Sequence, residues 1–131
     1  MGFSIDFSKL RKRLNDMDKK ASEAIIDKAL EAGAEVLIDS LKKNINNLAT
    51  DTGELRDSIG VTKKYGSGLE RKLRIAPKTS KKEVHDRAYY TNYGTRHIAG
   101  RHWKQKSIDE TRDEINRRIK EVVEEEIFKV W

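Results

Sequence analysis

The sequence predicts an α+β fold in which a long N-terminal helix and a C-terminal helix pack on a small antiparallel β-sheet with a central hairpin. Apolar residues recur at helical spacing near both ends of the chain, and two stretches of alternating side chains flank a glycine-containing turn between them. A length of 131 residues fits one domain with a modest core. We divide this domain into a helical arm (1–50), a basic, β-rich middle (51–104) and a C-terminal helix (105–131).

The first helix is predicted over 8–48, where apolar side chains recur at steps of three and four. The stripe runs through Leu10, Leu14, Met17, Ala21 and Ala24 and, after a small shift, through Ile26, Leu30, Gly33, Leu37, Leu41, Ile45 and Leu48. A helix of that length would measure roughly 60 Å, which exceeds a compact domain of this size. We therefore expect it either to break near Asn15 and Asp16 or to project and bury its stripe against another subunit. Asp6 or Ser8 would cap its start.

A β-hairpin is predicted from the alternation over 55–63 and 69–76. Between the two strands lies Tyr65-Gly66-Ser67-Gly68, whose glycines can adopt positive φ at little cost. Pro77, the only proline, would end the second strand because it cannot donate a ladder hydrogen bond. A charged, mobile loop is expected over 78–83.

The segment 88–95 is an aromatic cluster closed by Gly94. It fits either a short helix with Gly94 as its C′ residue or a third strand. The near-helical spacing of Tyr89, Tyr90 and Tyr93 is more typical of a core than of a binding surface.

A C-terminal helix follows a loop that contains several basic residues. Its apolar stripe is formed by Ile108, Ile115, Ile119, Val122, Val123 and Ile127. Ser107 is the expected N-cap, with Glu110 at the capping-box position.

Charge is distributed unevenly along the chain. The segment 56–106 carries 14 Lys or Arg against 4 Asp or Glu, whereas the whole chain has a net charge of +6. This basic middle is either a solvated surface or a contact for an acidic partner, protein or nucleic acid.

Cysteine and membrane signals are both missing from the sequence. Without cysteine there can be no disulfides or thiolate metal sites, and the composition fits a reducing compartment. The N-terminus has no apolar run of signal-peptide length, and no stretch of about 18 apolar residues occurs. We therefore expect no membrane partner.

Few residues point to catalysis. His97 and His102, with His85 and Asp86 upstream, could supply metal ligands, but their spacing matches no tight motif and neighbouring arginines repel cations. No serine lies in a nucleophile elbow, and the chain has neither a P-loop nor a dinucleotide fingerprint. We expect no enzyme, no metal and no cofactor, with a small metal-dependent enzyme around His97 and His102 as an alternative.

Nucleic-acid binding is the stronger alternative. The predicted hairpin carries Lys63, Lys64, Arg71, Lys72 and Arg74 close to aromatic residues, a combination that can track phosphates and stack on bases. Such a sequence-independent module would bind nucleic acid with an affinity that falls steeply with salt.

Two stretches are the most distinctive of the chain, Asp51-Thr52-Gly53-Glu54-Leu55-Arg56-Asp57-Ser58-Ile59 and Tyr90-Thr91-Asn92-Tyr93-Gly94-Thr95. In the first, Asp51 and Thr52 can bond their side chains to the nearby backbone, and Gly53 permits a sharp reversal before Leu55. In the second, Gly94 frees the backbone just after an aromatic anchor.

In this order and spacing, the two stretches resemble the tail-completion, or neck, proteins of long-tailed bacteriophages and prophages, which are often described as head–tail joining or minor tail components. Members have a long N-terminal helix, D-T-G-x-L-R-x-S-I before a strand, a hairpin, a Y-x-x-x-x-E-x-G-T-like element and a C-terminal helix. The first motif matches throughout. Asn92 stands where the family usually has Glu, Ala49-Thr50 replaces a proline, and His102-Trp103 replaces a Pro-Phe anchor.

The resemblance implies a structural role in virion assembly, in which copies of the chain form a ring that joins head to tail or completes the tail end. Its partners would be further copies of itself and other phage neck and tail proteins, with non-specific DNA contact in the channel. It would act in the bacterial host cytoplasm during assembly and then in the virion. The residues implied as structural or interface positions are Asp51, Thr52, Gly53, Leu55, Arg56, Tyr90, Tyr93, Gly94, Thr95 and Trp103. Trp131 is a further candidate for a buried anchor or an interface residue.

Overall fold

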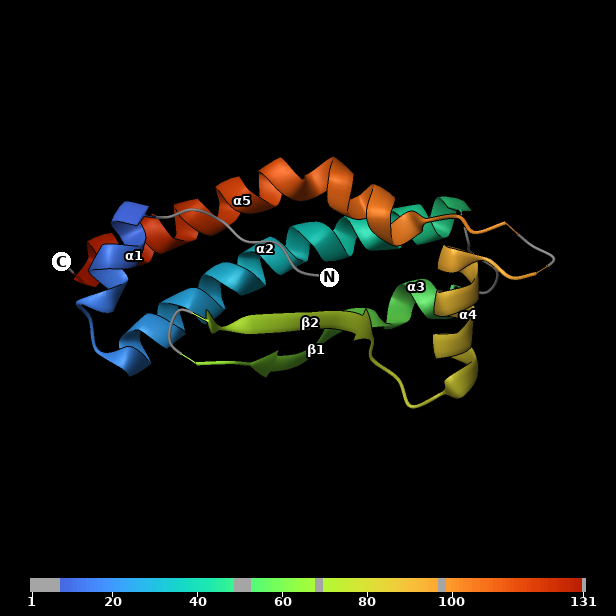
Figure 1. Cartoon of the computed structure of the whole chain (residues 1–131), viewed down its shortest axis with the longest axis horizontal. Coiled ribbons are helices and arrows are strands. Elements are labelled where there is room, and N and C mark those ends of the chain that lie inside the picture. The colour runs from blue at the N-terminus through green and yellow to red at the C-terminus, as the bar shows by residue number, and fades with distance from the viewer. Residues whose placement is uncertain (1–7, 49–52, 68–69, 97–98, 131) are drawn as a thin grey trace.

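The computed structural model describes residues 8–48, 53–67, 70–96 and 99–130, and it has the predicted α+β architecture. In chain order the elements are α1 (Ser8–Asn15), α2 (Lys19–Leu48), α3 (Glu54–Ser58), β1 (Ile59–Tyr65), β2 (Lys72–Pro77), α4 (Lys82–Tyr93) and α5 (Trp103–Val130). Figure 1 shows α2 running through the middle of an elongated molecule, with α5 along one side and the β1–β2 hairpin along the other. The short helices α3 and α4 lie together at the end opposite α1.

The N-terminal helix breaks where the sequence allows it, between Asn15 and Lys19, so the projecting-helix alternative is wrong. Asp18 begins α2 by accepting hydrogen bonds from the backbone N–H groups of Lys20 (3.1 Å) and Ala21 (3.4 Å), as an N-cap does. The Ser22 hydroxyl donates to the Leu14 carbonyl at 2.6 Å, which ties α1 back onto α2. The expected cap Asp6 and the side chain of Ser8 lie outside the described part.

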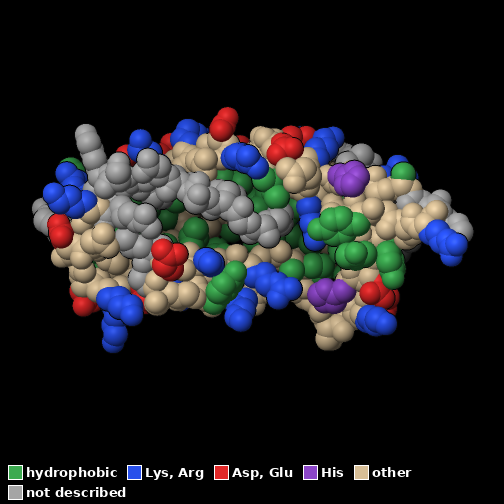
Figure 2. Space-filling model, viewed as in Figure 1, with side chains coloured by type: hydrophobic (Ala, Val, Ile, Leu, Met, Phe, Trp, Pro, Cys, Tyr) green, Lys and Arg blue, Asp and Glu red, His purple; other side chains and the backbone are tan. Residues whose placement is uncertain are grey.

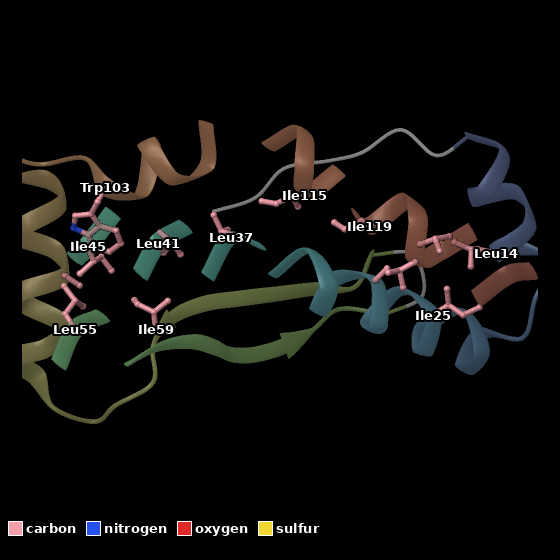
Figure 3. Close-up of a cluster of buried hydrophobic side chains, with 14 of the residues drawn as sticks. Leu14, Ile25, Leu37, Leu41, Ile45, Leu55, Ile59, Trp103, Ile115 and Ile119 are labelled. Carbon is pink, nitrogen blue, oxygen red and sulfur yellow. The ribbon is translucent and has the colours of Figure 1, made fainter. Parts of the chain in front are cut away.

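The core lies mainly between α2 and α5. Leu37, Leu41 and Ile45 of α2 are buried, as predicted, and they pack with the predicted α5 stripe. Figure 3 shows these side chains between the two helices and the sheet, with Leu14 and Ile25 continuing the same core toward the other end. Near the middle of α2 the two helices approach closely, because a Cβ on Gly33 would lie 2.8 Å from Cγ1 of Ile119.

The hairpin is confirmed, but both strands start later than predicted. The residues 55–58 belong to α3 instead, and its buried Leu55 and the first strand residue, Ile59, both face the core. The second strand begins at Lys72 and ends at Pro77, as the proline predicted. Gly66 in the turn has φ +85°, and a Cβ there would lie 2.1 Å from the Glu70 carbonyl oxygen.

The sheet has one covered and one open face. The strands are antiparallel, with a register shift between Val61 and Lys63. Ile59 and Val61 pair with Pro77 and Ile75 on the side that faces α2, whereas Lys63 pairs with Arg74 and Tyr65 with Lys72 on the exposed side. The hairpin therefore presents two pairs of exposed side chains away from the helices.

The predictions for α4 and the start of α5 need three corrections. Only 78–81 form the expected loop, since α4 begins at Lys82. The segment 88–95 is the end of this helix, closed by Gly94, and the third-strand alternative is wrong. The last helix begins at Trp103, and Ser107 is a buried interior residue whose hydroxyl donates to the Trp103 carbonyl at 2.7 Å instead of capping the helix. Within the described ranges, no helix has an apolar stretch that could span a bilayer.

Candidate interaction site

The two distinctive stretches of the sequence meet at one end of the molecule. The first contributes Gly53 and α3, and the second forms the last turn of α4 (Figure 1). The Lys81 ammonium, just before α4, bonds the Glu54 carboxylate of α3 at 2.8 Å. Asp51 and Thr52 lie outside the described residues. The fold thus brings together segments that are about 35 residues apart in the sequence.

Gly53 and Arg56 shape the turn before the first strand. Gly53 has φ +84°, and its carbonyl accepts the Asp57 backbone N–H at 3.0 Å. A Cβ at this glycine would lie 2.7 Å from Nη2 of Arg56, so both the backbone and the available space favour glycine. Arg56 donates to Asn46 Oδ1 at 2.7 Å and to Asp57 Oδ1 at 2.9 Å, which ties α3 to the last turns of α2. Leu55 is buried beneath this turn.

Trp103 joins α4 to α5. Its side chain is 1% exposed, and its indole N–H donates to the Thr91 hydroxyl oxygen at 3.0 Å. The Thr91 hydroxyl in turn donates to the Arg87 carbonyl at 2.6 Å. The tryptophan therefore fixes the last turn of α4 against the first turn of α5 through both packing and a hydrogen bond.

Asn92 is the second link between these helices. Its buried side-chain oxygen accepts the Lys104 backbone N–H at 3.0 Å, which is one of the unpaired donors at the start of α5. Its carbonyl accepts the His102 N–H at 2.9 Å, and the Thr91 carbonyl accepts the Arg101 N–H at 2.8 Å. The roles of Thr91 and Asn92 were not predicted, because a cap supplied by another helix leaves no local pattern in the sequence.

Three tyrosines on the outer side of α4 form what we call the tyrosine patch: Tyr89, Tyr90 and Tyr93. They are 57%, 51% and 56% exposed, so the expectation that they belong to the core is wrong. Their rings contact one another, with centroids 5.7 Å apart for Tyr89 and Tyr90 and 4.9 Å for Tyr89 and Tyr93. Figure 2 shows hydrophobic side chains gathered at this end of the molecule, beside basic ones. Exposed aromatic clusters of this kind are typical of interaction surfaces.

The remaining predicted residues of the second stretch turn the chain away from the patch. Gly94 has φ +88°, donates its N–H to the Tyr90 carbonyl at 2.8 Å and forms an isolated bridge with Ala99. Thr95 follows and is exposed. The close return of the chain also requires Gly100, because a Cβ there would lie 2.6 Å from the Tyr93 carbonyl carbon.

Lys104 borders the tyrosine patch. Its ammonium lies 5.5 Å from the centroid of the Tyr93 ring and 5.7 Å from that of Trp103. Burial lowers the pKa of Lys104 from its ordinary value. In the part of the chain that the structure describes, no carboxylate forms a salt bridge with this ammonium. A partly desolvated cation therefore stands at the rim of an exposed aromatic surface.

The two described histidines, His85 and His102, are not gathered into a ligand set. A ring nitrogen of His85 lies 2.7 Å from the Thr79 carbonyl oxygen, and His102 is exposed just before α5. His97 lies outside the described residues. Among the residues that are described, no three His, Cys, Asp or Glu side chains come close enough to hold a metal ion.

The basic hairpin is partly neutralised by α2. The Arg71 guanidinium bonds both oxygens of Asp27, at 2.8 and 3.0 Å, and this hydrogen bonding raises the pKa of Arg71. Lys64 pairs with Glu31. The open face keeps Lys63, Lys72 and Arg74, and the register sets two of these like charges directly opposite each other.

Replacing Asp27 with alanine is expected to loosen the hairpin, because Arg71 would lose its bidentate partner on α2. Hydrogen exchange followed by mass spectrometry should show that the β1–β2 amides exchange at least about three times faster. The increase should be confined to the hairpin. Asp39→Ala, at an exposed position of the same helix, is the matched control. Equal exchange in the two variants would show that the pair does not hold the hairpin.

The chain is an α+β domain with an exposed aromatic surface at one end. The chain belongs to the HK97-gp10-like family, described as "Bacteriophage HK97-gp10, putative tail-component", whose model matches residues 8–94. The match covers about two thirds of the chain and runs from α1 to the end of α4, including the tyrosine patch. No curated protein and no solved structure shows significant similarity to the chain. The family makes this protein a phage tail-related structural component, and its place is the virion.

Proposed function

We propose that this protein joins head to tail, or completes the tail end, of a phage or prophage particle as a homo-oligomeric ring. It would assemble in the host cytoplasm with other neck and tail proteins and without catalysing a reaction. The whole chain would act as one tail-completion-like domain, in which Gly53, Leu55 and Arg56 shape the turn and Trp103 anchors the patch. Family membership supports the tail assignment.

The tyrosine patch is the observation that carries the assembly role. Its three rings expose a large apolar area that costs free energy in water and that a partner could cover. The patch is attached rigidly, because Trp103, Thr91 and Asn92 bond α4 to α5. A ring needs two different complementary surfaces on each subunit. The tyrosine patch, at one end of an elongated molecule, would be the first of these surfaces.

Loss of the gene from the phage or prophage that carries it is expected to leave separate heads and tails, or tails with unfinished ends, in electron micrographs. Expression of the wild-type chain in trans should restore complete particles, which is the control. Complete, infectious particles formed without the chain would refute the proposal. Native mass spectrometry of the purified chain over a concentration series would then give the subunit number.

Contact with DNA is a second candidate function, supported by the open face of the hairpin. Lys63, Lys72 and Arg74 are exposed there, and Tyr65 lies beside them with the Lys63 ammonium 5.5 Å from its ring centroid. If these three cations contact phosphates, replacing all three with glutamine should make the slope of log binding constant against log salt concentration shallower by about three units. An unchanged slope would remove the hairpin from consideration.

A further inference from the structure

The other end of the molecule carries an exposed aromatic residue of its own. Phe128 on the last turns of α5 is 85% exposed, the most exposed of the large hydrophobic side chains that the structure describes. Figure 1 places this end of α5 at the opposite end of the long axis from α4. A phenylalanine this exposed is unfavourable in water unless something covers it.

The surroundings of Phe128 are acidic. Glu124 lies four residues earlier, on the same side of the helix, and is exposed. Of the basic neighbours, Lys129 is engaged with Glu126 at 3.3 Å. Lys120, one turn before Glu124 on the same side of the helix, is exposed and forms no ion pair among the described residues. Among the described residues, Glu124 has no ion-pair partner. The end of α5 thus presents an apolar ring next to a carboxylate that forms no ion pair with the described residues.

The α4 end has the complementary chemistry. The tyrosine patch offers aromatic faces that a phenyl ring can pack against, and Lys104 at its rim is a partly desolvated ammonium without a carboxylate partner in the described chain. Aromatic ring would meet aromatic rings, and a free carboxylate would meet a free ammonium.

We propose that the occupant of the tyrosine patch is a second copy of this chain, whose Phe128 packs on Tyr90 and Tyr93 while its Glu124 pairs with Lys104. This inference rests on the homo-oligomer of the proposed function and names the contact that would build it. Because the two surfaces differ and lie at opposite ends, the contact is head-to-tail. Such a contact repeats from copy to copy, and it produces a ring when the rotation closes.

Disulfide trapping tests the contact directly, because the natural chain has no cysteine. The single variants F128C and Y90C are purified, mixed and oxidised mildly, and the products are separated on a non-reducing gel. We expect a cross-linked dimer in the mixture at a yield about tenfold above that of either variant alone, since a disulfide needs Cα atoms within about 7 Å. Peptide mapping should find the 90–128 bridge.

A second cysteine position controls for random collision. Tyr65 is also an exposed tyrosine, on the hairpin, so Y65C mixed with F128C should give only background cross-linking. Equal yields for Y65C and Y90C would overturn the proposal. A predominant F128C–F128C or Y90C–Y90C product would also overturn it, because either one indicates a two-fold symmetric contact.

Charge reversal gives an independent measurement on chains without cysteine. E124K and K104E should each weaken self-association about tenfold, and mixing the two variants should restore it, because the mixture can form the reversed pair. Circular dichroism would confirm that both variants fold. Failure of the mixture to recover association would contradict the pairing.

The outcomes separate this inference from the proposed function. If discrete oligomers form but F128C and Y90C do not cross-link, the head-to-tail contact is wrong and the tail role stands. If the chain stays monomeric and shows no specific cross-link at its highest soluble concentration, the contact is likewise wrong. The tail role itself fails only if particles are complete without the chain.

Discussion

Replacing Trp103 with alanine is expected to lower the free energy of unfolding by about 3–5 kcal/mol. The side chain is 1% exposed, and it fills the space where the end of α4 meets the start of α5. Its removal leaves a large cavity that the surrounding helices can only partly close. The loss would be measured by urea denaturation followed by circular dichroism, because Trp131 also contributes to fluorescence.

Trp103→Phe is the matched control. It keeps most of the buried volume but removes the indole N–H that bonds the Thr91 hydroxyl. Because that hydroxyl retains its own hydrogen bond to the Arg87 carbonyl, we expect this variant to lose only about 1–2 kcal/mol. A value for Trp103→Ala within about 1 kcal/mol of the wild type would show that the tryptophan does not join the two helices.

Replacing Gly33 with leucine is expected to destabilise the protein by about 3 kcal/mol. Even a single Cβ at this position would lie 2.8 Å from Cγ1 and 2.9 Å from Cδ1 of Ile119, which is itself buried. The added side chain would push α2 and α5 apart along the longest contact of the fold. The gain in helix propensity on losing a glycine, about 1 kcal/mol, offsets only part of this strain.

The exposed position two residues further on supplies the comparison. Glu35→Leu adds the same side chain to α2 on its solvent side and should change stability by no more than about 0.5 kcal/mol. A double-mutant cycle of Gly33→Ala with Ile119→Ala should show coupling in which the double variant is more stable than the sum of the single changes predicts, because alanine removes both the Cγ1 and the Cδ1 contact. Additive effects would mean that the two helices relax apart without strain.

Much of the fold follows from periodicity in the sequence. The α5 stripe, the second half of the α2 stripe, the hairpin turn at Gly66 and the strand end at Pro77 appear as predicted, because each depends on local spacing or on the backbone of a single residue. In the first half of α2 the predicted Ala24 is exposed, and Ile25 and Ala29 are the buried residues instead. The short helix α3 was missed for a local reason as well. The alternation over 59–62 belongs to β1, but the predicted strand was extended back to Leu55 across three consecutive polar residues, 56–58, which do not alternate.

The tyrosine patch shows the limit of what helical periodicity can predict. Helical spacing establishes that Tyr89, Tyr90 and Tyr93 lie close together on α4, but it does not say which side of the helix the rest of the protein covers. Val84, Ala88 and Asn92, at i, i+4 and i+8, form the buried side instead. The three largest side chains of the helix are therefore left in solvent.

The sequence by itself determined the fold class, the order of the long helices and the hairpin, and the family resemblance, because these depend on patterns between neighbouring residues. Only the tertiary structure decided that α3, α4 and the start of α5 meet at one end, that Trp103 and Asn92 bond them together, and that Phe128 is exposed at the other end. These features result from packing between residues far apart in the chain, where the sequence carries no local record of which surfaces are covered and which are left free.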